Sequence, residues 1–147
     1  MNLLIPELLR DAACWPAALS GLDPLNVAEV GCGQGERCRL WAAHGHHVFG
    51  VDRHPGRIAL ARRHAFEGEL EILFDVAHAS ALPWPDRSMD LCLAPALLGS
   101  AANWRACLDE LGRVLRPGGT LCLGNGAGLR SFRLGAQGDC GASFTAG

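Results

Sequence analysis

The feature that most constrains the fold is a glycine loop between a strand-like and a helix-like segment. In "AEVGCGQGERCRLWA" (28–42), an apolar run leads into Gly31, Gly33 and Gly35, and a helical pattern follows. Glycine lets the backbone turn sharply and lets a ligand approach without a Cβ clash. The helix N-terminus beyond offers unpaired N–H groups to an anionic group. The loop is therefore a candidate ligand site, with a tight ligand-free turn as the alternative.

Strand-like and helix-like segments alternate along the chain. Strands are expected at 26–30, 47–52, 70–74, 90–94 and 120–124, and helices at 3–13, 36–43, 55–65 and 104–115. Strands that are apolar nearly throughout are typical of parallel strands covered on both faces. We therefore predict an open α/β sheet with helices on both faces. Its ligand is expected beyond the carboxyl ends of the strands.

Asp52 ends the second predicted strand, 21 residues after Gly31. An acid there can accept hydrogen bonds from both ribose hydroxyls of a nucleoside that lies across the loop. The alternative is a surface acid that pairs with Arg53 or Arg57. Glu36 stands where the dinucleotide fingerprint GxGxxG has its third glycine, and this counts against NAD.

Composition narrows the class of partner. A net charge of -2 gives no electrostatic argument for nucleic acid, and no run approaches the ~18 apolar residues that span a membrane. The seven cysteines are scattered and form no CxxC pair, so we read them as small core residues in a reducing cytoplasm. His44, His46 and His47 are expected in an exposed helix-to-strand turn, away from the ligand edge, and no metal site is predicted.

Several motifs follow one another between about Val27 and Gly124, in the order "VAEVGCGQG … GVD … ALPWPDRSMDLCLA … RVLRPGGTLCL". This order resembles the class I S-adenosylmethionine-dependent methyltransferases. It is most similar to the small-molecule group that includes the ubiquinone and menaquinone methyltransferases. The resemblance implies a Rossmann-like fold, S-adenosylmethionine as the cofactor and methyl transfer to a small-molecule acceptor.

The resemblance also implies which residues hold the cofactor. Those that would line its methionine part or orient its amino group are Glu29, Gly31, Cys32, Gly33 and Gly35. Those at the ribose and adenine would be Asp52, Arg53, His78 and Ala79. Ala94 and Pro95, past the fourth strand, would face the methyl donor and the substrate. The resemblance identifies no catalytic base, and "RVLRPGG" is structural in that family.

The sequence departs from the family pattern at two places where relatives have polar side chains. His78 stands where relatives commonly have an Asp that binds the adenine amino group, and a neutral imidazole accepts only one hydrogen bond. Gly99 and Ser100 replace a Glu-His pair that many relatives have after the fourth strand.

The third departure concerns the end of the chain. We expect a methyltransferase-like domain over 1–124 and a glycine-rich tail with the composition of a disordered segment over 125–147. This gives a C-terminally truncated sheet of about five strands that lacks the usual two closing strands. Its exposed edge predicts a homodimer, a partner chain or poor stability. The alternative functions are a truncated or non-catalytic binding module and, less favoured, an NAD(P)-binding oxidoreductase.

Overall fold

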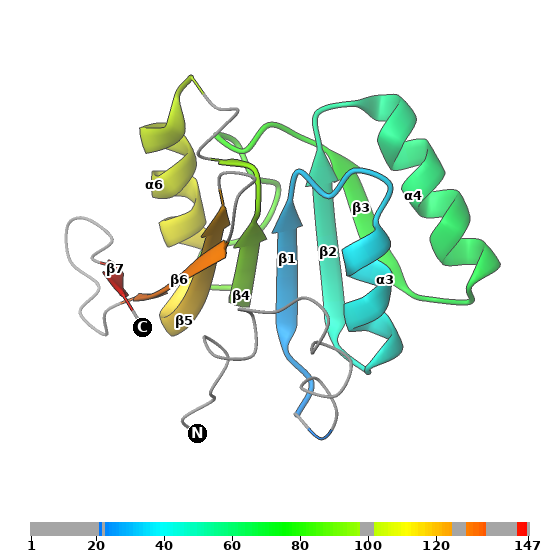
Figure 1. Ribbon diagram of the computed structural model, residues 1–147, viewed down its shortest axis with the longest axis horizontal. Coiled ribbons are helices and arrows are strands. Elements are labelled where there is room, and N and C mark those ends of the chain that lie inside the picture. Colours follow the sequence, from blue (N-terminus) through cyan, green and yellow to red (C-terminus); the bar gives the residue numbers. More distant parts are fainter. Residues whose placement is uncertain (1–20, 22, 98–101, 125–128, 135–143, 147) are drawn as a thin grey trace.

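The computed structural model describes residues 21, 23–97, 102–124, 129–134 and 144–146. They form one seven-stranded sheet with helices on its faces (Figure 1). The elements are β1 (Asn26–Val30), α3 (Glu36–Ala43), β2 (His47–Asp52), α4 (Pro55–Glu67), β3 (Ile72–Val76), β4 (Met89–Ala94), α6 (Trp104–Val114), β5 (Leu115–Gly124), β6 (Leu129–Leu134) and β7 (Phe144–Ala146). The helix expected over 3–13 lies outside the described residues.

The five predicted strands pair in the order β3-β2-β1-β4-β5, and every pair among them is parallel. This confirms the predicted open α/β sheet. The chain runs outward from β1 through β2 to β3 and then returns to the other side of β1 with β4. Such a reversal of strand order leaves a crevice at the carboxyl ends of β1 and β4, where open α/β sheets bind ligands.

Alternate residues of the strands face two separate cores. Val27 and Leu91 belong to the core under α3 and α4, together with Trp41 and other buried residues. Ala28 and Cys92 belong to the core under α6. Because side chains of a strand alternate between faces, a sheet covered on both sides needs apolar residues at nearly every position. This explains the continuous apolar runs of the sequence.

The outer edge of the sheet differs from the expectation. β6 pairs antiparallel with β5, and β7 pairs antiparallel with β6. The expectation that the sheet ends at the fifth strand therefore needs correction, since two further strands come from within 125–147. An unpaired edge offers free N–H and C=O groups, and an antiparallel neighbour joins through a short connection. The homodimer or partner chain inferred from a bare edge stays a prediction.

β3 begins two residues later than predicted because Leu70 serves the end of α4. Its backbone N–H donates to the Ala65 carbonyl across 2.9 Å, after Glu69 has turned the chain with a φ of 53°. A backbone N–H that bonds a free carbonyl at a helix end cannot also pair with a neighbouring strand of the sheet. The strand therefore begins at Ile72 and continues to Val76.

β5 begins earlier than predicted and contains the Pro-Gly-Gly segment. The ladder with β4 passes from Met89↔Leu115 to Leu91↔Thr120, so the residues between Leu115 and Thr120 bulge out. Gly118 supports the bulge with a φ of 79°. Pro117 and the two glycines thus mark an irregularity inside a strand, because the ladder resumes after them.

Candidate functional site

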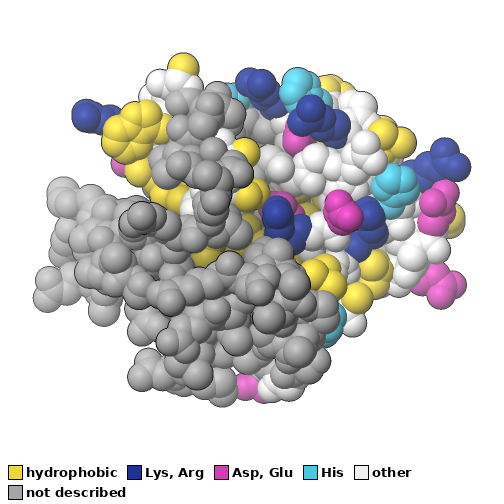
Figure 2. Space-filling view, viewed as in Figure 1, with side chains coloured by type: hydrophobic (Ala, Val, Ile, Leu, Met, Phe, Trp, Pro, Cys, Tyr) yellow, Lys and Arg dark blue, Asp and Glu magenta, His cyan; other side chains and the backbone are white. Residues whose placement is uncertain are grey.

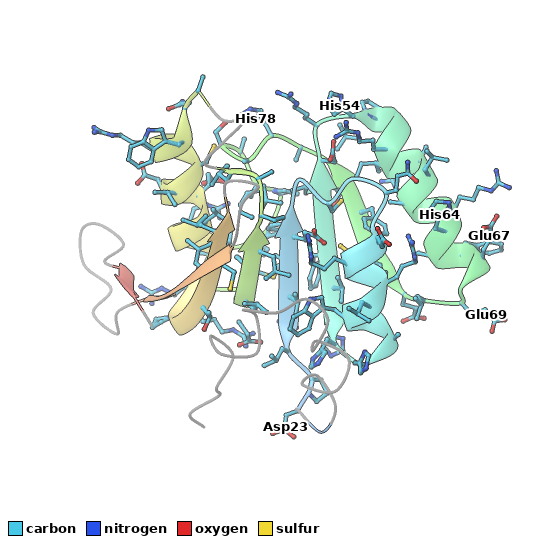
Figure 3. The ribbon with its side chains drawn as sticks, in the orientation of Figure 1. Asp23, His54, His64, Glu67, Glu69 and His78 are labelled. Carbon is cyan, nitrogen blue, oxygen red and sulfur yellow. The ribbon has the colours of Figure 1, made fainter. Side chains whose placement is uncertain are left out.

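A cavity of about 270 Å³ lies at the carboxyl ends of β1 and β2. His54 and His78 lie at this end of the sheet and Asp23 lies at the opposite end (Figure 3). Basic and histidine side chains gather on the surface there (Figure 2). The lining residues are Val30, Gly31, Asp52, Arg53, His54, Arg57, Ala77, His78, Ala79, Ala96 and Leu97.

Asp52 is the most constrained side chain of the cavity. It is only 4% exposed, and its two carboxylate oxygens accept hydrogen bonds from two backbone N–H groups. Oδ2 accepts from Gly33 at 3.0 Å and Oδ1 accepts from His54 at 2.9 Å, while the Arg57 guanidinium lies 3.8 Å from Oδ2. A carboxylate has about four lone-pair sites. Each oxygen therefore retains capacity for one further donor, which fits the two hydroxyls of a ribose.

Gly31 and Gly33 leave the space beside Asp52 clear. Their φ angles are +74° and +56°, and a Cβ built on either residue would meet no atom within 4 Å. The backbone conformation, which L side chains rarely adopt, requires glycine there. The open space is the kind of cradle that a ligand lying against the backbone needs.

Gly35 has a different role from its two neighbours. A Cβ at Gly35 would lie 2.6 Å from Cζ of Phe74, so the glycine allows α3 to pack closely on the sheet. The side chain of Cys32 also turns away from the cavity and is buried in the core under α3 and α4. The close packing that a third glycine provides in the dinucleotide fingerprint is thus present here, one position before Glu36. The predicted cofactor contacts of Cys32 and Gly35 stay predictions.

Glu29 faces α3 and has two protein partners. Arg37 donates to its Oε1 at 2.7 Å, and the Cys38 thiol lies 3.1 Å from its Oε2. Burial raises the pKa of Glu29, and the positive charge of Arg37 opposes the rise. A hydrogen bond with Cys32, together with burial, raises the pKa of the Cys38 thiol. Orientation of the cofactor amino group by Glu29 stays a prediction.

His78 follows β3 and lies beside the end of β2. The backbone N–H of Ala77, the preceding residue, donates to the Asp52 carbonyl at 3.2 Å. The imidazole Nδ1 accepts from the Ser80 backbone N–H at 3.2 Å and lies 2.7 Å from the Ser80 hydroxyl. His78 and Ala79 both line the cavity, so the structure brings these predicted adenine neighbours to the same wall as Asp52.

The wall past β4 is formed by residues one or two positions later than predicted. Ala94 is fully buried in the core under α6, whereas Ala96 and Leu97 line the cavity. Sequence reasoning also missed four other lining residues, namely Val30, His54, Arg57 and Ala77. Val30, His54 and Ala77 lie at or just after strand ends, and this position was the signal that could have identified them, whereas Arg57 lies in the first turn of α4.

The histidine cluster is a structural feature and is not the fully exposed turn that we expected. His46 is only 4% exposed, its Nδ1 accepts from the Leu25 backbone N–H at 3.1 Å, and its ring meets Trp41 edge-on at 5.3 Å. The Nδ1 of His44, two residues earlier, lies 2.8 Å from the Leu40 carbonyl oxygen. Burial of His46 results from its position between α3 and β2, since the turn folds back onto Trp41. The described residues contain no group of side chains arranged for a metal ion.

The "LPWPD" segment is held by one arginine of α6. Arg113 donates to the carbonyls of Leu82 and Trp84 at 3.1 and 2.9 Å, and to Asp86 at 2.7 Å. Two further hydrogen bonds join Arg113 to Glu110, three residues earlier on the same helix. The hydrogen bonds that Arg113 donates to Glu110 and Asp86 raise the pKa of Arg113, and those that Glu110 accepts lower the pKa of Glu110. Arg113 therefore fixes this segment against α6.

The cysteines that the structure describes are buried and free. They are Cys32, Cys38, Cys92, Cys107 and Cys122. Burial raises the pKa of Cys122 to about 12, as expected for a thiol surrounded by apolar atoms. This confirms the prediction that Cys92, Cys107 and Cys122 are core residues.

Comparisons with known proteins identify the family. The profile of a methyltransferase domain matches residues 28–123. The ubiquinone biosynthesis O-methyltransferase of Nitrobacter winogradskyi is 30% identical over 141 residues, which cover 92% of this chain and 54% of that protein. The demethylmenaquinone methyltransferase of Thermus thermophilus is 36% identical over 100 residues, 67% of this chain and 46% of that protein. A solved SAM-dependent methyltransferase from Methanosarcina mazei has a TM-score of 0.64 and 31% identity, over 69% of this chain and 52% of that one.

The fold and the site define a Rossmann-like domain with a crevice at the carboxyl ends of its strands. Together with the matched family, this shows that the chain belongs to the class I S-adenosylmethionine-dependent methyltransferases. The chain spans about half the length of the curated relatives it matches. Among the helices that the structure describes, none has both the length and the apolar character to cross a membrane.

Proposed function

We propose that this chain binds S-adenosylmethionine and supports transfer of its methyl group to a small-molecule acceptor. The observation that carries the proposal is Asp52, buried at the end of β2 and bonded to the glycine loop through Gly33. The cofactor, when bound, supplies a methyl group that is already activated by the sulfonium charge. The protein must then mainly position the reactants and exclude water.

Each part of the cofactor has a matching part of the cavity. Asp52 offers acceptors to the ribose hydroxyls, and the open backbone of Gly31 and Gly33 gives room for the methionine part. Arg53 and His78 lie where the base would extend from the ribose. The cavity, at about 270 Å³, is at the low end of the ~300–1,000 Å³ usual for small-molecule sites.

The acceptor is proposed to be an aromatic alcohol or quinol. The named relatives are a ubiquinone biosynthesis O-methyltransferase and a demethylmenaquinone methyltransferase, and Ala96 and Leu97 give the cavity an apolar wall past β4. Such a wall suits a flat apolar ring. The buried free thiols support a reducing cytoplasmic location for the reaction.

A binding module without turnover is the second candidate. The observation that favours it is the sequence after β4, where Gly99 and Ser100 replace the Glu-His pair of many relatives. An acceptor that must lose a proton needs a base. A methyltransferase without one would be restricted to acceptors that attack without first losing a proton.

Calorimetric titration with S-adenosylhomocysteine and with NAD tests the cofactor. We expect the first to bind and the second to give no heat beyond dilution, and binding of NAD alone would reject the proposal. Transfer of labelled methyl from S-adenosylmethionine to a panel of catechols and quinols tests the reaction. Binding without transfer to any of them would favour the non-catalytic module.

A further inference from the structure

The edge of the sheet at β3 carries exposed apolar side chains beside a second cavity. Phe66 of α4 is 85% exposed and Leu73 of β3 is 65% exposed. The cavity, of about 520 Å³, lies at the amino ends of β2 and β3, and its lining residues differ from those of the cavity at the carboxyl ends. Phe66 and Leu73 line it together with Leu70 and Ile72. A projecting aromatic ring beside an apolar hollow marks a candidate surface for another protein.

The backbone edge of β3 is partly occupied by the protein itself. Arg62 of α4 reaches over the strand, where its Nη2 donates to the Phe74 carbonyl at 2.5 Å and lies 3.8 Å from a carboxylate oxygen of Asp75. Among the described strands, β3 pairs only with β2. Charged side chains along an edge strand oppose the addition of a further strand. A partner is therefore expected to contact the side chains of α4 and β3 and not to extend the sheet.

The charge of the exposed side chains changes sign at Phe66. Arg62 and Arg63 precede it, one turn earlier on α4. The exposed acidic residues that follow it are Glu67, Glu69 and Glu71. Figure 3 shows Glu67 and Glu69 at the end of α4 that is away from the candidate cofactor site. Because opposite charges lie on either side of one apolar side chain, this surface is complementary to a copy of itself that runs in the opposite direction.

We propose that a second copy of this chain docks on this surface, with the two α4 helices antiparallel about a two-fold axis beside Phe66. Arg62 is four residues before Phe66 and Glu69 is three residues after it. Arg62 of each copy therefore meets Glu69 of the other copy. Ala59, on the same face of α4, is small and exposed, so it lets the helices approach. Each Phe66 ring then enters the cavity of the other copy, against Leu73.

Both charges are available for such a contact. A guanidinium carries several N–H groups, so Arg62 keeps donors beyond the one that bonds the Phe74 carbonyl. Within the described ranges, Glu69 forms no ion pair, whereas Arg63 and Glu67 pair with each other at 2.8 Å. The presence of both signs of charge opposes docking on an anionic membrane, which attracts basic residues and repels acidic ones. It favours a partner with the same two charges in reverse order, which a second copy has.

Sedimentation equilibrium of the whole chain over a range of concentrations tests the proposal. Wild type is expected to dimerise with a dissociation constant in the micromolar range, since few large apolar side chains form the centre of the interface. Phe66→Ser is expected to raise this constant about tenfold or more. Phe66 is exposed, so the variant should fold, and urea unfolding checks this. Trp104→Ser, on an exposed aromatic residue of α6, is the matched control with an unchanged constant.

Charge reversal tests the antiparallel arrangement. In a dimer of Arg62→Glu acidic residues meet across the axis, and in a dimer of Glu69→Arg basic residues meet, so each variant alone is expected to be monomeric. An equimolar mixture of the two restores opposite charges at both contacts and is expected to associate as tightly as wild type. If Arg62→Glu loses stability together with its bond to the Phe74 carbonyl, Arg63→Glu takes its place.

Three outcomes would overturn the proposal. A wild type that stays monomeric up to about 1 mM would leave the surface to a different protein. Equal effects of Phe66→Ser and Trp104→Ser would show that the dimer forms elsewhere or not through Phe66. A mixture of the charge variants that stays monomeric would reject the antiparallel pairing of Arg62 with Glu69. Self-association is measured without any cofactor, so these outcomes are independent of the proposed function.

Discussion

The backbone N–H of Gly33 donates to Oδ2 of Asp52 across 3.0 Å, although 19 residues separate the two along the chain. Because Asp52 also accepts from the His54 N–H, one buried carboxylate fixes the glycine loop, the end of β2 and the approach to α4. The loop and the ribose position are therefore one unit. A change at Asp52 should alter both the ligand contact and the loop that supports it.

The first prediction concerns the charge at this junction. Asp52→Ala is expected to weaken S-adenosylhomocysteine binding by about 150-fold or more, because two hydrogen bonds to a charged group of ~1.5–3 kcal/mol each would be lost. Asp52→Asn keeps one acceptor oxygen, and we expect an intermediate loss of about tenfold. Calorimetric titration measures both.

Asp75→Ala is the matched control for the Asp52 variants. Asp75 lies on the neighbouring strand β3, is exposed and forms only a 3.8 Å ion pair with Arg62. Removal of so weak a surface pair should leave cofactor affinity unchanged. Equal effects of Asp52→Ala and Asp75→Ala on binding would contradict the ribose assignment.

The second prediction separates the glycines by what surrounds them. Gly35→Ala should destabilise the protein by about 3 kcal/mol, from a strained positive φ and from the 2.6 Å clash with Phe74. Gly31→Ala carries only the conformational strain, since no atom lies within 4 Å, and should cost about 1 kcal/mol. Urea unfolding measures both free energies.

A second substitution tests whether packing is the cause at Gly35. Phe74→Leu removes the ring atoms that the new Cβ would meet. The double variant with Gly35→Ala should therefore lose less stability than the sum of the two single changes. Additive losses would mean that the backbone conformation alone requires glycine at this position.

The local sequence pattern predicts the bounds of those helices and strands that are determined by neighbouring residues in the sequence. β1, β2 and α3 match their expected bounds because each is an apolar or periodic run ended by glycine or a charged residue. β3 is displaced because Leu70 satisfies a helix end through Ala65. β6 was not expected because its pairing with β5 depends on a free sheet edge and not on its own apolar content.

In the candidate site, too, the sequence predicts what depends on local order and misses what depends on tertiary packing. Asp52 and Gly31 are identified from their order after two strands, and the cavity places both on its wall. The direction of a side chain depends on which helix covers each face of the sheet. For this reason the sequence did not predict the bond between Glu29 and Arg37.

The third prediction concerns the arginine of α6. Arg113→Lys should destabilise the protein by about 2 kcal/mol, because an ammonium cannot reproduce a planar fork that reaches Leu82, Trp84 and Glu110 together. Solvent limits the loss, because a third of the Arg113 side chain is exposed.

Arg116→Lys is the matched control for Arg113→Lys. Its side chain is 47% exposed and forms one ion pair, with Asp90 at 2.9 Å. A surface pair of this kind typically contributes under ~1 kcal/mol. Thermal and urea unfolding compare the two variants, and equal losses would mean that Arg113 does not brace the "LPWPD" segment.

The last prediction uses two carboxylates whose pKa values are shifted in opposite directions. Burial raises the pKa of Glu29 above its ordinary 4.5, while the bonds from Arg113 lower the pKa of Glu110 below 4.5. A carboxyl group whose pKa is raised in the folded state contributes stability that is fully present below pH 4.5. This contribution is lost as the pH rises through the folded-state pKa. A carboxyl group whose pKa is lowered in the folded state contributes stability that is present above pH 4.5. This contribution is lost as the pH falls through the folded-state pKa.

Glu29→Gln and Glu110→Gln remove these two dependences one at a time. Relative to Glu29→Gln, wild type should gain in free energy of unfolding as the pH falls from 7 toward 4.5. Relative to Glu110→Gln, wild type should lose free energy of unfolding as the pH falls below 4.5. Urea unfolding across this pH range measures both differences. Parallel pH profiles of wild type and Glu29→Gln would show that Arg37 and Cys38 compensate the burial of the Glu29 charge in full, because then its pKa would not differ between the folded and unfolded states.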